Sequence, residues 1–418
     1  MSTATEDFGV GLDEIRAAAR ALKGNAVRTP LIAAPRLSAM LGCELYLKLE
    51  NQQYTGSFKD RGSYIKLTSL DDAQKRTGVI AMSAGNHAQG VAYHAQRLGI
   101  PATIVMPEGA PFSKVERTRN FGARVVQSGE TIDEAADVAR ELMDSEGLTF
   151  VHPYDDPVVV AGQGTIGLEI FEDQPDIDSI VVPIGGGGVI SGTALAAKAL
   201  RPETEILGVE AKLFPSMYQA VHSLDPTSGG TSIADGIAVK RPGKLNRRII
   251  EALVANIVLV DEPTLETAVA TLADYQKVVA EGAGAAPLAA LLDTPQRLAG
   301  RKVALVICGG NIDSRMLASV LMRNLVREGR LVRLRIDIND APGVLAKVAG
   351  LIGRSGANIV EVYHQRLFHD VPVRKAEVDA VVETRNASHV EEIIGALESG
   401  GFPTRILSTL STTGPTQA

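Results

Sequence analysis

One lysine and three glycine-rich segments are the features of this chain that could carry out chemistry. Lys59 lies in YTGSFKDRGS, residues 54–63, between an aromatic residue and an acid, with glycines at 56 and 62. The glycine-rich segments are MSAGNHAQG at 82–90, PIGGGGVISG at 183–192 and CGGN at 308–311. Most lysines are solvated surface groups, so these other segments decide whether Lys59 is different.

Four consecutive glycines, Gly185, Gly186, Gly187 and Gly188, separate an apolar run from a helical pattern. Residues without side chains let several backbone N–H groups converge on one anion, and the N-terminus of the next helix adds its positive end. This tetraglycine loop is not a Walker loop, because no Lys-Ser or Lys-Thr pair follows it, and it lacks the G-x-G-x-x-G spacing. A tight turn alone rarely needs four glycines, so we predict a phosphate-binding loop.

The other two segments have both a structural and a functional interpretation. A predicted strand meets a predicted helix at Ser83, Gly85, Asn86 and His87, which we call the corner at 83–87. Exposed amides there could hold a carboxylate, or the polar residues could only cap the helix. Cys308 ends an apolar run, where it either fills the core or offers a weak hydrogen-bonding group at a sheet edge. A phosphate loop together with a lysine amine suits pyridoxal phosphate, which needs an anion site and a Schiff-base lysine.

Short apolar runs alternate with longer amphipathic segments, and these elements must position the residues above. We predict strands at TGVIAMS, PATIVMP, ARVVQSG, LTFVHP, SIVVPIG, TEILGVE and KVALVICGG, and helices between them, such as TIDEAADVARELMDSEG. Such alternation predicts an α/β fold with a parallel sheet buried on both faces. All three glycine-rich segments follow predicted strands, at the edge where parallel sheets bind ligands.

The pattern changes near residue 330. The segments LVRLRIDIND, APGVLAKVAGLIGRSG, ANIVEVYHQRLF, KAEVDAVVETR, SHVEEIIGALESGG and PTRILSTL follow the order strand, helix, strand, strand, helix, strand. This order predicts a compact α+β module with a ferredoxin-like connection. We therefore expect domains at 1–330, with a smaller subdomain at about 50–150, and at 331–418, with a disordered tail from about 411.

Composition narrows the function classes. The chain has 418 residues, 45% hydrophobic and 22% charged, which is typical of a globular protein with more than one domain. A net charge of −7, 4% aromatic content and no tryptophan argue against nucleic acid or a membrane surface as a partner. Two cysteines make no disulfide framework or metal cluster, and the acidic amino terminus does not resemble a signal peptide. We predict a cytoplasmic protein without a membrane span.

The chemistry-bearing segments, taken together, resemble those of a known family. TGSFKDRG, SAGNHAQG, PYDDPVVVAGQGTIGLEI, PIGGGGVISG, EGAGAAPLAALL and CGGNID resemble the motifs of fold-type II pyridoxal-phosphate enzymes, and among these the chain is similar to threonine dehydratases (threonine ammonia-lyases). The resemblance implies two open, twisted, mainly parallel sheets with helices on both faces. The C-terminal module, with DAPGVLAKV and ANIVEVYHQ, resembles an ACT domain, a unit that often binds amino acids.

The resemblance also implies a set of cofactor contacts. Lys59 would form the imine with pyridoxal phosphate, and Phe58 would lie against the cofactor. Asn86 would hydrogen-bond the 3′-oxygen of the ring, and Cys308 would face the pyridine nitrogen. The amides of the tetraglycine loop and of Val189 would hold the phosphate.

The implied reaction is the deamination of an amino-acid substrate. The amides around Ser83, Ala84, Gly85 and His87 would hold the substrate carboxylate, and Lys59 would remove the Cα proton as general base. Loss of the β-hydroxyl as water would convert L-threonine into 2-oxobutanoate and ammonia, and L-serine into pyruvate. A neutral thiol at position 308 cannot hold a proton on the ring nitrogen, which favours elimination over transamination.

Several positions depart from relatives or leave alternatives open. Racemising relatives have a second serine where this chain has Ala84, so we expect little or no racemase activity. Asp60 follows the lysine as it does in threonine synthases, so threonine synthase or another fold-type II β-eliminating enzyme is one alternative, and a non-catalytic amino-acid sensor is another. Glu210 marks a cation site in some relatives, but GVEAKLFPSMY has no further acid, so we expect no metal. Glu281 either contacts the cofactor or only begins a helix, and we treat His152 as structural.

The ACT-like module has a loop that could bind an effector. The residues Asp340, Gly343, Val344 and Leu345 offer backbone N–H groups to a ligand carboxylate, and relatives often line the effector pocket or the pairing edge at the position of Asn358. We predict allosteric control by an amino acid such as isoleucine or valine. The alternative is a module that only dimerises. In either case we expect a homo-oligomer, a dimer or a tetramer.

Overall fold

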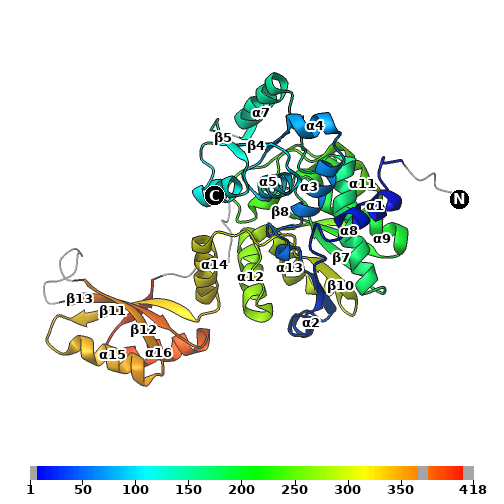
Figure 1. Cartoon of the computed structure of the whole chain (residues 1–418). Helices are drawn as coiled ribbons and strands as arrows, with labels where there is room; N and C mark the ends of the chain where they lie inside the picture. Colours follow the sequence, from blue (N-terminus) through cyan, green and yellow to red (C-terminus); the bar gives the residue numbers. More distant parts are fainter. Residues whose placement is uncertain (1–6, 131, 366–374, 408–418) are drawn as a thin grey trace. The chain divides into compact units, whose positions relative to one another are not determined.

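A computed structural model describes residues 7–130, 132–365 and 375–407, and the chain divides into two compact units (Figure 1). The first unit is Met1–Asp313 and the second is Ser314–Ala418. We expected the boundary near 330. It lies earlier because helix α14 (Ser314–Arg327) packs against strand β11 of the second unit. The tail from 411 lies outside the described residues, and no described helix is long and apolar enough to cross a membrane.

The larger sheet of the first unit has the strand order β1-β2-β10-β7-β8-β9. Only β1 runs antiparallel to its neighbour; the other pairs are parallel. The strands are β1 (Leu31–Ala33), β2 (Glu44–Lys48), β7 (Ser179–Pro183), β8 (Glu205–Ala211), β9 (Asn256–Val260) and β10 (Lys302–Val306). The predicted strands β7, β8 and β10 are confirmed. We did not predict β1, β2 and β9, which lie toward the sheet edges, where burial is partial.

The smaller sheet has the order β5-β4-β3-β6, and all its pairs are parallel. Its strands are β3 (Val79–Met82), β4 (Ala102–Met106), β5 (Arg124–Gln127) and β6 (Thr149–Phe150), all at predicted positions. Successive residues of a strand point to opposite faces. Ala81 and Ile104 therefore pack with helix α5 (Asn86–Leu98), whereas Ile80 and Val105 pack with helix α7 (Ile132–Glu146). This sheet lies within the subdomain that we expected at about 50–150.

The remaining helices of the first unit cover these sheets and carry the loops between strands. They are α1 (Leu12–Leu22), α2 (Pro35–Leu41), α3 (Lys59–Thr68), α4 (Asp72–Thr77), α6 (Phe112–Asn120), α8 (Pro157–Asp173), α9 (Gly188–Leu200), α10 (Ser216–Val221), α11 (Lys244–Leu253), α12 (Glu262–Thr271) and α13 (Gly282–Asp293). Helix α13 packs against β7, β8, β9 and β10. Glycines bring α3, α8 and α9 into backbone contact: a Cβ on Gly162 would lie 2.8 Å from the Cα of Gly62, and a Cβ on Gly192 would lie 2.5 Å from the backbone N of Gly164. Any larger residue would push these helices apart.

The second unit is an antiparallel sheet of order β12-β13-β11-β14 with two helices on one face (Figure 1). Its elements are β11 (Leu331–Asn339), α15 (Val344–Arg354), β12 (Asn358–Gln365), β13 (Lys375–Glu383), α16 (Ala387–Ser399) and β14 (Thr404–Ile406). This order is the predicted one. Helices α15 and α16 bury Val348, Ile352 and Ile393 against the strands.

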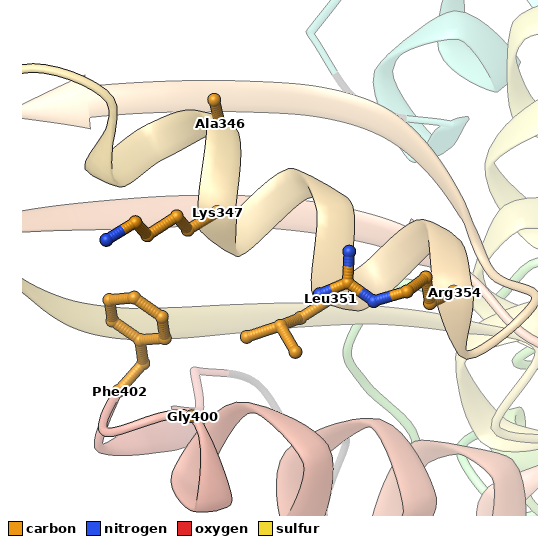
Figure 2. Close-up of a pocket in the computed structure, with 6 residues that line it drawn as sticks. All are labelled: Ala346, Lys347, Leu351, Arg354, Gly400 and Phe402. Carbon is orange, nitrogen blue, oxygen red and sulfur yellow. The ribbon is translucent and has the colours of Figure 1, made fainter.

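A groove of about 420 Å³ lies between α15 and the residues after α16 (Figure 2). Its lining residues are Ala346, Lys347, Leu351, Arg354, Gly400 and Phe402. Lys347 and Arg354 are two helical turns apart on α15 and have no ion-pair partner within the described ranges.

Candidate active site

Lys59 is the first residue of helix α3, and its amine lies in a half-buried position. Its Nζ donates a hydrogen bond to the carbonyl oxygen of Pro153 at 2.5 Å and lies 5.1 Å from the centroid of the Phe58 ring. Burial lowers the pKa of Lys59 to about 8, and the neighbouring Cys308 and Glu281 oppose this only in part. A fraction of this amine is therefore neutral near neutral pH, which an ordinary lysine is not.

The segment 152–155, called the strap here, connects Lys59 to the tetraglycine loop. His152 Nδ1 accepts hydrogen bonds from the backbone N–H groups of Tyr154 (3.2 Å) and Asp155 (2.8 Å), which curls the strap and directs the Pro153 carbonyl toward Lys59. The Asp155 carboxylate accepts from the backbone N–H of Lys244 at 2.9 Å and so holds the start of α11. In the sequence we matched this segment to the family but gave Pro153 and Tyr154 no role.

The tetraglycine loop lies directly against Tyr154. A Cβ on Gly186 would be 2.1 Å from the Tyr154 ring, and Gly187 has φ +96°, so neither position accepts a larger residue without strain. The Gly186 carbonyl accepts from the Asn246 side chain and the Gly243 backbone. Among the described residues, none accepts a hydrogen bond from the N–H of Gly185, Gly186 or Gly187.

The corner at 83–87 offers fewer amides than we expected. The N–H of Ser83 donates to the Val105 carbonyl at 3.1 Å, and the N–H of Gly85 donates to the Ser83 hydroxyl at 3.1 Å, so both are occupied. The N–H groups of Ala84 and His87 have no acceptor in the described part of the chain. His87 Nε2 contacts the Val151 carbonyl at 2.8 Å, and burial lowers its pKa to about 3, which keeps the ring neutral.

Asn86, Glu281 and Asn311 form a hydrogen-bonded chain across the first unit. Asn86 Nδ2 donates to Glu281 Oε1 at 2.6 Å, and Asn311 Nδ2 donates to Asn86 Oδ1 at 2.8 Å. Glu281 is buried, and that burial raises its pKa to about 7, with Asp235 adding to the effect. Glu281 immediately precedes α13 and also accepts a hydrogen bond from Asn86, a predicted site residue. Asn311 was not among the predicted site residues.

Cys308 follows strand β10 and is fully buried. Its carbonyl oxygen accepts from the Phe58 backbone N–H at 3.0 Å, which ties the start of α3 to the end of β10. Burial raises the pKa of the Cys308 thiol, and Glu281 adds to this, so the thiol stays protonated. The strap contacts Lys59 and the tetraglycine loop, and Phe58 and Cys308 lie next to Lys59.

The position considered for a metal has no cluster of ligands. Glu210 is buried at the end of β8, and its carboxylate accepts from the backbone N–H groups of Met217 (2.9 Å) and Tyr218 (2.8 Å). Burial raises its pKa to about 7. No group of three or more His, Cys, Asp or Glu side chains placed to hold a metal occurs in the described ranges.

The five effector candidates belong to the second unit, and the structure does not bring them all together. Asp340, Gly343, Val344 and Leu345 lie at the start of α15, just after Asn339 at the end of β11. Asn358 pairs with Glu383, which pairs with Leu331 at the other end of β11. Eight residue steps, or about 27 Å of strand, separate these ends. One copy of the unit therefore cannot use Asn358 together with the loop.

The residues of the first unit fit pyridoxal phosphate. Three consecutive loop N–H groups without acceptors in the described ranges, two of them on buried glycines, precede the N-terminus of the 13-residue helix α9, as a phosphate group requires. The Lys59 amine is the type of group that can form an imine, and the strap connects it to the phosphate loop. The fold and the site therefore define an enzyme that uses this cofactor.

Comparison with known proteins agrees with this class. Residues 22–309 match the family described as pyridoxal-phosphate dependent enzyme, and the chain belongs to that family. It is 45% identical over 400 residues, covering 95% of this chain and all of the relative, to the L-threonine ammonia-lyase of Thermotoga maritima. A solved threonine deaminase from T.th. is similar in structure, with TM-score 0.69, 39% identity and coverage of 72% of this chain and 99% of that one. Maize serine racemase is also similar, with TM-score 0.71, 35% identity and coverage of 76% and 98%.

We predict that Lys59 reacts as an unusually acidic lysine. In the cofactor-free full-length protein, labelling of Lys59 by fluorodinitrobenzene should increase with pH and level off above a midpoint near 8, because only the neutral amine reacts. Peptide mapping separates Lys59 from the exposed Lys23, which serves as the internal reference. A midpoint for Lys59 near the ordinary lysine value of 10.5 would contradict the desolvated environment described above.

Proposed function

We propose that this chain is a threonine ammonia-lyase, which converts L-threonine into 2-oxobutanoate and ammonia by β-elimination of water, and that it converts L-serine into pyruvate by the same route. The observation that carries this proposal is the Lys59 amine, held against the Pro153 carbonyl beside a loop of glycine amides that have no acceptor among the described residues. The 45% identity to an L-threonine ammonia-lyase over 95% of the chain supports the choice of substrate.

The proposed roles are of two kinds: some residues bind the cofactor, and Lys59 also acts as the general base. When bound, pyridoxal phosphate supplies an electron sink for negative charge at the substrate Cα. Gly185, Gly186, Gly187, Gly188 and the amide of Val189 hold its phosphate. Lys59 carries the cofactor and, once displaced by substrate, removes the Cα proton, a task for which an amine with a pKa of about 8 is well matched.

The other residues orient substrate and cofactor. The N–H groups of Ala84 and His87 hold the substrate carboxylate at the start of α5, with the Ser83 hydroxyl bracing Gly85. Asn86, fixed by Glu281 and Asn311, faces the 3′-oxygen of the ring. The neutral Cys308 thiol faces the pyridine nitrogen and provides no negative charge there, which favours elimination of water over transamination.

The geometry around Asp60 gives no support to threonine synthase. Asp60 is fully buried, accepts from the backbone N–H of Thr55 at 3.0 Å and lies 3.7 Å from His94 Nε2. Its carboxylate therefore holds the loop before Lys59 rather than reaching toward a substrate. A non-catalytic sensor would not require Lys59 at its desolvated position, so this alternative is also the weaker one.

We propose further that the enzyme is a homo-oligomer, a dimer or a tetramer, and that it works in the cytoplasm. Both Cys43 and Cys308 are buried free thiols, as expected for a reducing compartment.

The first prediction from this function concerns Lys59 itself. Purified wild-type protein should release 2-oxobutanoate from L-threonine and pyruvate from L-serine, and Lys59→Ala should lower both rates by about 10²–10⁴-fold or more, because the substitution removes the base. Lys75→Ala on helix α4 is the matched control and should keep the wild-type rate. Wild-type turnover that survives in Lys59→Ala, or no keto acid from the wild type, would refute the proposal.

The second prediction separates this enzyme from racemases. Ala84 has no group that can donate a proton to the opposite face of Cα, so wild-type protein should form pyruvate but no D-serine from L-serine. Ala84→Ser should make D-serine detectable by chiral chromatography. Formation of D-serine by the wild type at a rate comparable to pyruvate would show that a different residue supplies the proton.

The third prediction concerns control by an amino acid. We propose that isoleucine or valine binds at Asp340, Gly343, Val344 and Leu345, where Gly343 has φ +86° and begins α15. The response of threonine deamination to these amino acids should be lost in Gly343→Ala, because alanine strains that backbone. Gly353→Ala in the same helix, where a Cβ meets only open space, should keep it. Loss of the response in Arg354→Ala instead would move the site to the groove of Figure 2.

A further inference from the structure

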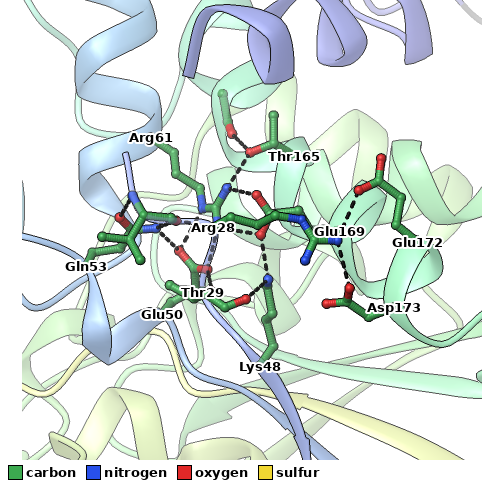
Figure 3. Close-up of polar contacts among 12 residues, drawn as sticks. Arg28, Thr29, Lys48, Glu50, Gln53, Arg61, Thr165, Glu169, Glu172 and Asp173 are labelled. Carbon is green, nitrogen blue, oxygen red and sulfur yellow. Dashed lines mark hydrogen bonds and ion pairs between the residues drawn. The ribbon is translucent and has the colours of Figure 1, made fainter. Parts of the chain in front are cut away.

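Four charged side chains of the first unit are buried together (Figure 3). The Arg61 guanidinium donates to both oxygens of Glu50, at 2.8 and 2.7 Å, and to both oxygens of Glu169, at 2.6 and 2.8 Å. Lys48 Nζ donates to Glu169 Oε2 at 2.5 Å and to the Thr29 carbonyl at 2.6 Å. Arg61, Lys48 and Glu50 are at most 1% exposed and Glu169 is 12% exposed. We call these four residues the charge cluster.

The cluster is neutral as a whole, with two cations and two carboxylates. Burial raises the pKa of the Glu50 carboxyl, but the charge and the hydrogen bonds of Arg61 outweigh it and hold that pKa below its usual value. Burial also disfavours the charge on Arg61, and the two carboxylates more than compensate. Glu50 and Arg61 therefore each stabilise the charged form of the other.

Buried ion pairs contribute little net stability compared with well-packed apolar residues, although removing one partner of such a pair is strongly destabilising. Stability alone therefore does not explain why four charges occupy this position. What such a cluster does provide is one fixed arrangement, since the planar guanidinium of Arg61 binds each carboxylate through two parallel bonds in a single geometry.

The cluster joins the three segments on which the candidate site is built. Arg61 follows Lys59 by two residues, so it points about 200° away around helix α3 and holds the helix from behind. Lys48 ends strand β2, where its carbonyl accepts from Ile307, the residue before Cys308. Glu169 lies on α8, the helix that follows the strap and its Pro153 carbonyl.

A further contact ties Arg61 to the glycine crossing between α3 and α8. Thr165 accepts from Arg61 Nη1 at 3.0 Å and donates to the Gly162 carbonyl at 2.7 Å. Gly162 is the residue whose absent side chain lets α8 touch Gly62. Thr165 therefore links the orientation of the Arg61 guanidinium to the close approach of α3 and α8.

We propose that Arg61, through its paired bonds to Glu50 and Glu169, is a positioning residue that holds Lys59 in its productive place between the strap and Cys308. Arg61 touches neither substrate nor cofactor and acts only through the orientation of α3. This inference rests on the proposed function of Lys59 as the base, and it adds a residue on which that function depends.

The test uses Arg61→Lys in the holoenzyme. Lysine keeps the positive charge, but its ammonium group cannot make the paired hydrogen bonds that a planar guanidinium makes to each of two carboxylates. We expect kcat per bound cofactor to fall about tenfold while KM stays within about twofold, because a small displacement of the base slows proton transfer without altering the carboxylate site. The induced circular dichroism of the cofactor band, per bound cofactor, should also fall, because Lys59 no longer holds the cofactor in one orientation.

Two further variants complete the design. Ile170→Val, next to Glu169 and fully buried, is the control that loses packing without touching the cluster, so it should lower the melting temperature and leave kcat and the dichroism at wild-type values. If Arg61→Lys does not fold, Thr165→Val, which removes one bond to Arg61 and no charge, should lower kcat about two- to threefold with the dichroism following in the same direction.

The outcomes separate the two hypotheses. If the wild type lacks a cofactor band, the proposed function fails. If the wild type has the band, and the folded Arg61 or Thr165 variant melts earlier but keeps wild-type kcat and dichroism, Arg61 only stabilises the fold and the positioning role is refuted.

Discussion

The mutual neutralisation of four buried charges constrains how the elements around Lys59 are arranged. Arg61, Lys48, Glu50 and Glu169 come from α3, β2, its following turn and α8, and displacing any of them would leave another charge unpaired where little or no water reaches it. These elements therefore have one relative arrangement. Because Lys59 begins α3, and because the strap precedes α8, that arrangement also decides what the Lys59 amine contacts.

The site itself uses desolvation and backbone dipoles more than paired side-chain charges. Burial lowers the pKa of Lys59 to about 8, and burial also lowers the pKa of His87 and raises that of the Cys308 thiol, so both stay neutral. We propose that the amides of the tetraglycine loop bind the phosphate and that those at 83–87 bind the substrate carboxylate. Such a site provides strong directional donors with no competing counter-ion, which suits a reaction whose charge moves between substrate, cofactor and leaving group.

Much of this could be predicted from the sequence, because the parallel strands are continuous apolar runs and the glycine-rich segments follow them directly. The tetraglycine loop, Lys59 and Cys308 each have a local pattern that indicates a role. The contacts of Asn86 do not, because Glu281 and Asn311 lie 195 and 225 residues away in the chain and only the folded sheet brings them together. The occupied Ser83 amide, the Tyr154 ring against Gly186 and the separation of Asn358 from the α15 loop depend on strand register and packing, which no local pattern specifies.

One particular amine is proposed to carry the cofactor, and chemical trapping tests this most directly. Purified holoenzyme should be reduced with borohydride, digested and mapped by mass spectrometry, with an unreduced sample processed in parallel. We expect the pyridoxyl group on the peptide that contains Lys59 and on that side chain. A label on another lysine, or no label on a protein that retains its keto-acid-releasing activity, would contradict the proposal that Lys59 carries the cofactor.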